Sequence, residues 1–339
     1  MPINIVYSTS ELYSECTGIS IFSLLKNNNE IDEMDIYILE TKLSFNSKSK
    51  ILQIGNLFSR RIIFVDAQDE FNQYTTKLKF KYLRGSYNTY ARVMLNAWFS
   101  HLDKVLLIDS DTLVIGSIKE LWDTNIEKHL IGAVPEIAVY SQFSTNESSD
   151  IVSSSSPYFN MGIVLINLKL WRDRNIDKYI EDMVSKYNKD FLIADQSILN
   201  YTINQDIYRL HLKYNYYSSV HAVNYSTIRK NFCKKEIFSL HEFEDARKNP
   251  IILHFIGHPF ERPWYRGNAS YYNNIYQKYR LETPWANDKL RKIPRAKNIL
   301  FALYDKTTYI LLKLHMYKTA HWYRYIIAQK WKNKLKTHR

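Results

Sequence analysis

Cysteine, glycine and long apolar runs are all scarce in this chain of 339 residues. The two cysteines, Cys16 and Cys233, are too few and too far apart for a disulfide framework or a structural zinc site, and they favour a reducing compartment. The eight glycines include no Gly-x-Gly pair and no Walker A loop, which argues against a dinucleotide-binding domain and a P-loop ATPase. The chain also lacks the roughly eighteen consecutive apolar residues of a membrane-spanning helix, so we expect none.

Positive charge is abundant but unevenly placed. The chain has 46 lysines and arginines against 34 acids, a formal net charge of +12. Fourteen of these basic residues and only two of the acids lie in residues 286–339, so the preceding part of the chain is formally neutral. Such an asymmetry is typical of a tail that meets an anionic surface. No nucleic-acid-binding module accompanies the charge, so we expect no nucleic acid partner.

The basic tail also carries apolar and aromatic side chains among its lysines, for example Leu300, Leu303 and Trp322. Basic amphipathic helices of this kind lie in the headgroup plane of anionic membranes. Helices that pack their apolar sides on the rest of the chain are the alternative, and the two arrangements are compatible. The N-terminus shows no signal peptide. We therefore predict a mostly helical, membrane-associating extension at 286–339, in a cytoplasmic protein peripheral to the inner face of the cell membrane.

Short runs rich in isoleucine and valine alternate with amphipathic stretches in the first 200 residues. Strands are predicted at 3–7, 35–39, 62–65, 105–108 and 162–166, and helices at 11–25 and 89–99. This alternation predicts a mostly parallel α/β sheet with helices on both faces. Ligands of such sheets bind beyond the carboxyl ends of the strands. The polar residues 141–156 predict a loop that covers or flanks the site.

Two aspartates, Asp109 and Asp111, directly follow the apolar run at 105–108. A buried strand does not accommodate two acids unless their charge is compensated, and a divalent cation is the obvious candidate. Mn²⁺ and Mg²⁺ both bind carboxylate oxygens, and they commonly hold substrate phosphates as well. The alternative is that the strand ends at Asp109 and that both acids are solvated turn residues.

A second apolar run, at 250–256, contains His254 and is followed by Gly257 and Arg262. A histidine after an apolar run is more often a structural residue than a ligand. Here it is a candidate third metal ligand, because a glycine lets backbone amides approach a diphosphate closely and an arginine pairs with phosphate oxygens.

Four further polar residues stand at the predicted ends of elements or on a helix. Asp195 reads as a helix N-cap, Asn160 as a turn residue and Arg92 as a surface charge, when each is judged by its spacing alone. The other interpretation is that Asp195 and its neighbour Gln196 face a reacting sugar.

Five segments occur in an order that is more specific than any one of them. Thr-Tyr-Ala-Arg at 89–92, Asp-x-Asp at 109–111, Phe-Asn-x-Gly at 159–162, Asp-Gln-x-Ile-Leu-Asn at 195–200 and His-Phe-x-Gly to Pro-Trp at 254–264 follow one another. This set resembles glycosyltransferase family 8, in particular the bacterial lipooligosaccharide and polysaccharide galactosyl- and glucosyltransferases. The resemblance covers about residues 3–285. It implies an α/β, GT-A type nucleotide-diphospho-sugar transferase fold with a Rossmann-like mixed sheet for 1–285.

The resemblance further implies a retaining transfer of galactose or glucose from a UDP-hexose, with Mn²⁺ or Mg²⁺ bound. Its acceptor would be a saccharide or lipid-linked glycan in surface polysaccharide or lipooligosaccharide synthesis. The implied metal ligands are Asp109, Asp111 and His254. The implied nucleotide and diphosphate residues are Tyr7, Ser10, Tyr13, Ser110, Gly257 and Arg262, with Tyr13 stacked on the uracil. The implied sugar contacts are Arg92, Asn160, Asp195 and Gln196, with Gln196 near the β face of the sugar.

The chain departs from this family pattern at three places. Ser10 stands where most relatives carry an acid that is expected to read the uracil. Phe260 and Glu261 are two extra residues in the His-to-Trp motif, and Arg262 stands where a lysine is usual. Arginine keeps the positive charge and adds bidentate geometry, so phosphate binding should survive.

Two other classes of protein remain open from the sequence. Asp109-Ser110-Asp111 after an apolar strand also matches a haloacid-dehalogenase-type phosphatase with Asp109 as the nucleophile. That motif normally lies near the start of such a domain, so its position argues against this class. A catalytically silent membrane- or glycan-binding paralogue is the other alternative, because the Ser10 region is altered.

Overall fold

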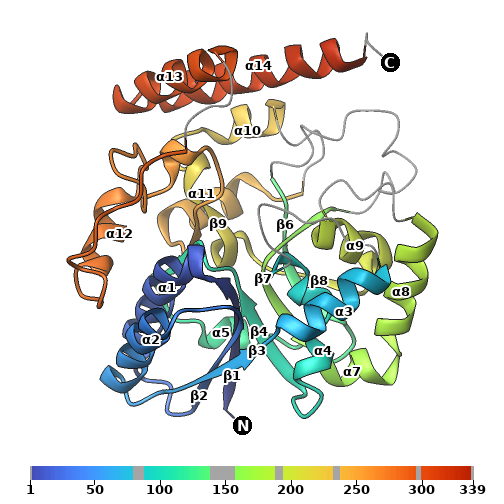
Figure 1. Cartoon of the computed structure of the whole chain (residues 1–339). Helices are drawn as coiled ribbons and strands as arrows, with labels where there is room; N and C mark the ends of the chain where they lie inside the picture. Colours follow the sequence, from blue (N-terminus) through green and yellow to red (C-terminus); the bar gives the residue numbers. More distant parts are fainter. Residues whose placement is uncertain are drawn as a thin grey trace.

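The computed structural model describes residues 2–78, 88–137, 157–187, 194–231, 237–294 and 299–336. A sheet of seven strands, in the order β3-β2-β1-β4-β7-β6-β8, forms its centre (Figure 1). These strands are β1 (Ile3–Ser10), β2 (Met34–Thr41), β3 (Arg61–Asp66), β4 (Lys104–Ile108), β6 (Ile131–Pro135), β7 (Phe159–Asn167) and β8 (Ile207–Arg209). A smaller sheet is built in the order β5-β10-β9 from β5 (Thr112–Val114), β10 (Ile252–His254) and β9 (Tyr216–Tyr217).

Each face of the large sheet is covered by an apolar core, because side chains of a strand point alternately to its two faces. Ile5 of β1 belongs to the core on one face and Val6 to the core on the other. The first face carries α1 (Ser14–Lys26) and α2 (Phe45–Leu57), followed further along the chain by α5 (Lys119–Trp122), α11 (Leu240–Lys248) and α12 (Asn273–Arg280). The second face carries α3 (Gln68–Leu78), α4 (Leu95–Trp98), α7 (Leu168–Asp173), α8 (Ile176–Tyr187) and α9 (Ala194–Thr202).

The predicted strands are all present, and helices cover both faces as expected. The direction of β7 is the main difference from the mostly parallel sheet that the alternation of apolar runs and amphipathic stretches predicts. β1, β2, β3 and β4 are parallel to one another, whereas β7 runs antiparallel to both β4 and β6. The sheet is therefore mixed, since an apolar run encodes burial but not the direction in which the strand runs.

The predicted helix over 89–99 is instead a 3-10 helix, η2 (Asn88–Val93), followed by the short α4. The physical reason lies in the burial of this segment. All residues from Tyr90 to Leu95 are buried, so it has no solvent-exposed face of the kind that an amphipathic α-helix presents. The predicted helix over 11–25 begins in the same way, with η1 (Glu11–Tyr13) preceding α1. The predicted loop at 141–156 lies outside the described residues.

The C-terminal part of the chain folds into two helices, α13 (Ile299–Lys313) and α14 (Tyr317–Lys336), which lie side by side at one end of the molecule (Figure 1). The expectation of a helical tail is thus confirmed. None of the described helices is long and apolar enough to cross a membrane. Residues just beyond 285 are tied to the first face, because the buried Arg280 donates to the carbonyl oxygens of Ala286 and Asp288 and pairs with Glu15 at 2.7 Å. The division of the chain at 285/286 stays a prediction.

Candidate active site

Asp109 and Asp111 occupy the turn between β4 and β5, at the carboxyl end of the central strand β4. Three hydrogen bonds to the backbone fix this turn. The amide of Asp109 donates to Gly162 of β7 at 2.7 Å, the carbonyl of Asp111 accepts from Phe255 at 2.9 Å, and the Thr112 hydroxyl donates to the carbonyl of Asp109 at 2.8 Å. The strand therefore ends at Ile108, and both acids lie in the turn after it, but the turn aims both carboxylates at one place.

That place also receives His254, 143 residues further along the chain. β10 pairs antiparallel with β5 and sets His254 opposite Thr112. Its Nε2 atom lies 3.1 Å from Asp111 Oδ1 and 3.8 Å from Asp109 Oδ2, and one ligand atom from each of the three residues lies within 4.8 Å of the others. Two carboxylate oxygens and an imidazole nitrogen suit Mn²⁺, so the donor set fits the ion that the sequence motifs implied.

A chain of hydrogen bonds fixes which nitrogen of His254 carries the proton. The Asn160 amide donates to Glu136 Oε2 at 2.8 Å, so its own Oδ1 accepts from the backbone of Gly162 and from Asn215 Nδ2, at 2.8 and 2.7 Å. Asn215 Oδ1 is thereby left to accept from His254 Nδ1 at 2.8 Å. We therefore assign the proton to Nδ1, which points the Nε2 lone pair at the two carboxylates, as partners of metal-binding histidines commonly do.

Gly162 leaves the room that this group of ligands needs. A Cβ atom at this position would lie 2.3 Å from His254 Cε1 and 2.9 Å from Asp109 Oδ2. Any side chain larger than hydrogen would therefore push the imidazole and the carboxylate out of their places. The Phe-Asn-x-Gly motif thus contributes the Asn160 amide and, through Gly162, the room that His254 and Asp109 occupy.

Arg92 lies buried between two acids. Its Nη2 donates to Asp109 Oδ1 at 2.7 Å, its Nε lies 2.9 Å from Asp195 Oδ2, and its Nη1 donates to the carbonyl of Met161. Asp109 therefore directs one oxygen to the arginine and the other to His254. Arg92 is a buried part of the site and not the surface charge that its position on a helix would suggest.

Burial sets the charge balance of these acids. It raises the pKa of Asp195 to about 6, although the Arg92 guanidinium opposes the shift. It also raises the pKa of Asp109, against the opposing charge of Arg92. Burial would do the same to Asp111, but without a bound cation a second proton on His254 Nε2 outweighs it and holds the pKa of that carboxyl below its usual range. A bound cation would take the place of that proton. A site with three acids and this little solvent is electrostatically suited to a cation.

The amide of Gln196 joins this site from the first turn of α9. Its Oε1 accepts from Asn160 Nδ2 and from the backbone of Met161, both at 3.2 Å, and its Nε2 lies 3.4 Å from Glu136 Oε2. The structure thus brings together the residues expected to contact the sugar, with Asp195 directly before Gln196 on the same helix.

The residues expected to bind the nucleotide are placed less uniformly. Tyr13 is half-buried, with its ring edge-on to Trp264 at 6.3 Å between centroids. Arg262 lies over the same indole at 5.8 Å, and its buried Nε has no hydrogen-bond partner among the described residues, which suits an anionic ligand. Gly257 has a φ of +149°, a conformation that favours glycine. Ser10, half-buried, precedes η1 and makes no capping hydrogen bond.

Two expected nucleotide contacts are engaged elsewhere. Tyr7 is fully buried in the core, where its hydroxyl is hydrogen-bonded to Ser20 at 3.0 Å, so its phenol is not available to a ligand. The reason is that Tyr7 points to the α1 face of β1, which the sequence did not reveal. Ser110 donates to the carbonyl of Ser8 at 3.1 Å and accepts from Thr17 at 2.9 Å, so its hydroxyl fastens the aspartate turn to β1 and α1.

Sequence reasoning missed Glu136 and Asn215. Glu136 directly follows the apolar strand β6, the same signal that singled out Asp109, and it could have been found in this way. Asn215 closes the 3-10 helix η4 (Leu212–Asn215) and has no comparable signal in the sequence. Only the pairing of β9 with β10 brings it to His254.

Solved structures identify the class of fold. The galactosyltransferase LgtC, determined with donor and acceptor sugar analogues, superposes with a TM-score of 0.67 at 22% sequence identity. The match covers 84% of this chain and 99% of LgtC. The fold is accordingly of the GT-A type, with a mixed central sheet, as the sequence motifs predicted.

The chain belongs to glycosyl transferase family 8, whose family description matches residues 4–267. It is 24% identical over 287 residues to general stress protein A of Bacillus subtilis, covering 84% of this chain and 94% of that protein. It is also 24% identical over 306 residues to a lipopolysaccharide 1,2-glucosyltransferase of Escherichia coli, covering 88% and 82%. A Haemophilus influenzae protein, itself a proposed glycosyltransferase, is 29% identical to this chain over 199 residues. The matched part spans only 58% of the length of that protein. Family membership sets the phosphatase alternative aside.

We expect Gly162→Ala to weaken Mn²⁺ binding by about tenfold or more, because the added methyl group displaces His254 and Asp109. Titration of the protein with Mn²⁺, followed by calorimetry or by the electron paramagnetic resonance signal of free Mn²⁺, measures this. Gly132→Ala on the adjacent strand is the matched control, since its Cβ would meet Leu210 at an ordinary 3.4 Å. Equal Mn²⁺ affinity of the two folded variants would contradict the assigned metal site.

Proposed function

We propose that this family 8 glycosyltransferase is a retaining, metal-dependent hexosyltransferase. It moves galactose or glucose from a UDP-hexose to a saccharide or lipid-linked glycan acceptor in surface polysaccharide or lipooligosaccharide synthesis. The observation that carries the proposal is the convergence of Asp109, Asp111 and His254 beside the buried Arg92. Because all three expected metal ligands are present, a catalytically silent paralogue is disfavoured.

The residues present define how the donor would be held. A bound Mn²⁺ would neutralise the negative charge that develops on the departing UDP. Arg262 would pair with the diphosphate through its unpartnered guanidinium nitrogen, and Gly257 would let backbone amides approach it. Tyr13, which lies near Trp264 and Arg262, would stack on the uracil. Such preorganised charges are commonly the largest contribution to catalysis of this kind.

We infer that the acceptor attacks the anomeric carbon from the face that UDP leaves. A double displacement needs a nucleophile on the opposite face, where Gln196 is a poor one and Asp195 is paired with Arg92 at 2.9 Å. In front-face attack the acceptor oxygen bonds to the anomeric carbon, the bond to UDP breaks, and the departing phosphate oxygen accepts the acceptor's proton.

Front-face attack leaves no hexosyl group on the protein. Intact-protein mass spectrometry during turnover of a slow UDP-sugar analogue should therefore show only the unmodified mass. A hexosyl adduct mapped to Asp195 by peptide sequencing, and lost in Asp195→Asn, would overturn this route.

The donor assignment predicts a strong effect of removing one metal ligand. We expect Asp111→Ala to lower the rate of UDP release by about 100-fold or more with the preferred donor in Mn²⁺, since the ion loses a ligand. A panel of UDP-galactose, UDP-glucose and UDP-N-acetylglucosamine measures this and names the hexose. Asp123→Ala, which removes a carboxylate that is 52% exposed and pairs with Lys119, is the control. Equal turnover of wild type and Asp111→Ala would refute the metal assignment.

We also propose that residues 1–285 form the catalytic domain and that 286–339 attach it to an anionic membrane surface. In the described part of α13 and the turn after it, one side is buried along Thr308 and Leu312. The opposite side exposes apolar side chains at intervals of three, four and seven residues, namely Leu300, Leu303, Ile310 and Leu314. The excess positive charge of the chain lies in the same segment, so apolar insertion and attraction to anionic headgroups would act together.

A double substitution tests the membrane surface without touching the core. Leu303→Glu with Ile310→Glu replaces side chains that are 57% and 46% exposed, so the fold should persist. We expect the variant to bind vesicles rich in phosphatidylglycerol about tenfold more weakly in a sedimentation assay, because two inserted side chains and favourable charge are lost. Leu57→Glu with Leu240→Glu, at exposures of 66% and 54% elsewhere, is the matched control. Equal vesicle binding of both double variants would remove the proposal.

A further inference from the structure

The segment between Gly257 and Arg262 is covered by the C-terminal helices. It contains the 3-10 helix η6 (Pro259–Glu261). This helix includes Phe260 and Glu261, the two residues that the resemblance to family 8 marks as extra. Both of these residues meet the C-terminal helices, Phe260 on α13 and Glu261 on α14. The ring of Phe260 packs against Tyr309 of α13 at 4.9 Å between centroids.

The carboxylate of Glu261 has neighbours in three parts of this region. Its buried carboxylate accepts from the backbone of His258 at 2.9 Å and pairs with Arg324 of α14 at 2.5 Å. The same oxygen lies directly against Gly257, since a Cβ there would approach it to 2.7 Å. One carboxylate thus joins the start of the diphosphate segment, the cap of η6 and the last helix of the described chain.

A second pair ties the same segment to α13. His258 Nε2 lies 2.9 Å from Asp305 Oδ1, and the amide of Arg262 in turn donates to Pro259 of η6 at 3.2 Å. Because Arg262 follows η6 directly, the position of its guanidinium depends on the position of that short helix.

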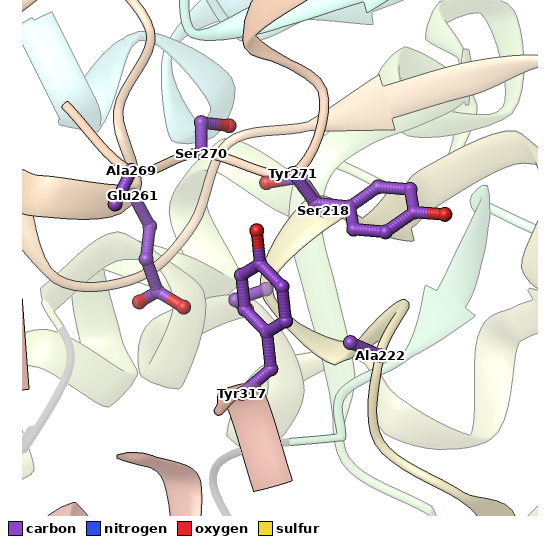
Figure 2. A pocket seen from close by; sticks show the side chains of 8 residues that line it. Ser218, Ala222, Glu261, Ala269, Ser270, Tyr271 and Tyr317 are labelled. Atoms are coloured by element: carbon purple, nitrogen blue, oxygen red, sulfur yellow. The ribbon is translucent and has the colours of Figure 1, made fainter. Parts of the chain in front are cut away.

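A small cavity of about 10 Å³ lies at this junction (Figure 2). Glu261 and Ser270 line it together with Ser218 and, from α14, Tyr317. The hydroxyls of Ser218 and Ser270 are buried and have no hydrogen-bond partner among the described residues. The space suffices for about one water molecule, which would satisfy the two hydroxyls beside Tyr317 of the hairpin.

We propose that the α13–α14 hairpin is a clamp that holds the Gly257–Arg262 segment in its donor-binding conformation, with Glu261 and Arg324 as positioning residues. The proposal rests on the proposed function, in which Arg262 meets the donor diphosphate. Removal of Arg324 would leave the buried Glu261 carboxylate without its counter-charge, which is costly in a buried position. The carboxylate would move toward solvent and release its contacts to His258 and Gly257.

The test compares Arg324→Gln with Lys318→Gln in the full chain, since Lys318 is an exposed cation on the same helix. Without donor, we expect amide hydrogens of residues 257–262 to exchange about three- to tenfold faster in Arg324→Gln, the effect of losing one coupled partner. With Mn²⁺ present, UDP should bind more weakly by a similar factor in calorimetry. Glu261→Gln should act alike, and the double variant should add little to either single one.

Each outcome decides one part of the proposal. Unchanged exchange at 257–262 in Arg324→Gln would overturn the clamp, whatever the donor is. Faster exchange with unchanged UDP affinity would overturn the positioning role alone. If wild-type protein binds no UDP in Mn²⁺ while exchange responds, the proposed function is wrong, and the role of the clamp in donor binding falls with it. Arg324→Lys, which keeps the charge, should restore most of the exchange protection at 257–262. If Arg324→Lys instead loses protection throughout the chain, the specific role of the Glu261–Arg324 pair is overturned.

Discussion

The site depends on one physical constraint, the compensation of three acids at the buried edge of a sheet. Arg92 supplies a permanent positive charge between Asp109 and Asp195, and it is itself buried. Without this guanidinium the acids would face one another in a medium that penalises charge. The arrangement also divides the work of Asp109, because Arg92 takes one carboxylate oxygen and the other faces His254. The negative charge of Asp109 and Asp111 that Arg92 does not balance creates a site for a divalent cation.

A second theme is that the C-terminal hairpin has two different faces. One face lies on the Gly257–Arg262 segment through the carboxylate of Glu261 and the ring of Phe260. The other presents exposed leucines and an isoleucine in the region that carries the excess positive charge of the chain. One helix pair thus lies between the surface that we propose binds the membrane and the segment that we propose binds the donor diphosphate.

Most of the fold follows from the sequence, because burial and periodicity are local properties of a strand or helix. The apolar runs at 105–108 and 162–166 gave the strands correctly, yet not the reversed direction of β7, which depends on its partners β4 and β6. The segment at 89–99 has helical spacing, but because Tyr90 to Leu95 are all buried it forms a 3-10 helix followed by a short α-helix. Local patterns predict elements well and predict their pairing poorly.

For the site, the sequence by itself determined the residue types and their order: the Asp-x-Asp pair, a distant histidine and the motifs that mark family 8. The tertiary structure decided which of them meet. Strand pairing between β5 and β10 brings His254 to Asp111, and β9 adds Asn215 behind it. The alternation of side chains along β1 turns Tyr7 into the core and away from any ligand. The physical reason is that composition and spacing act along the chain, whereas charge compensation and coordination act through space between residues that only pairing brings together.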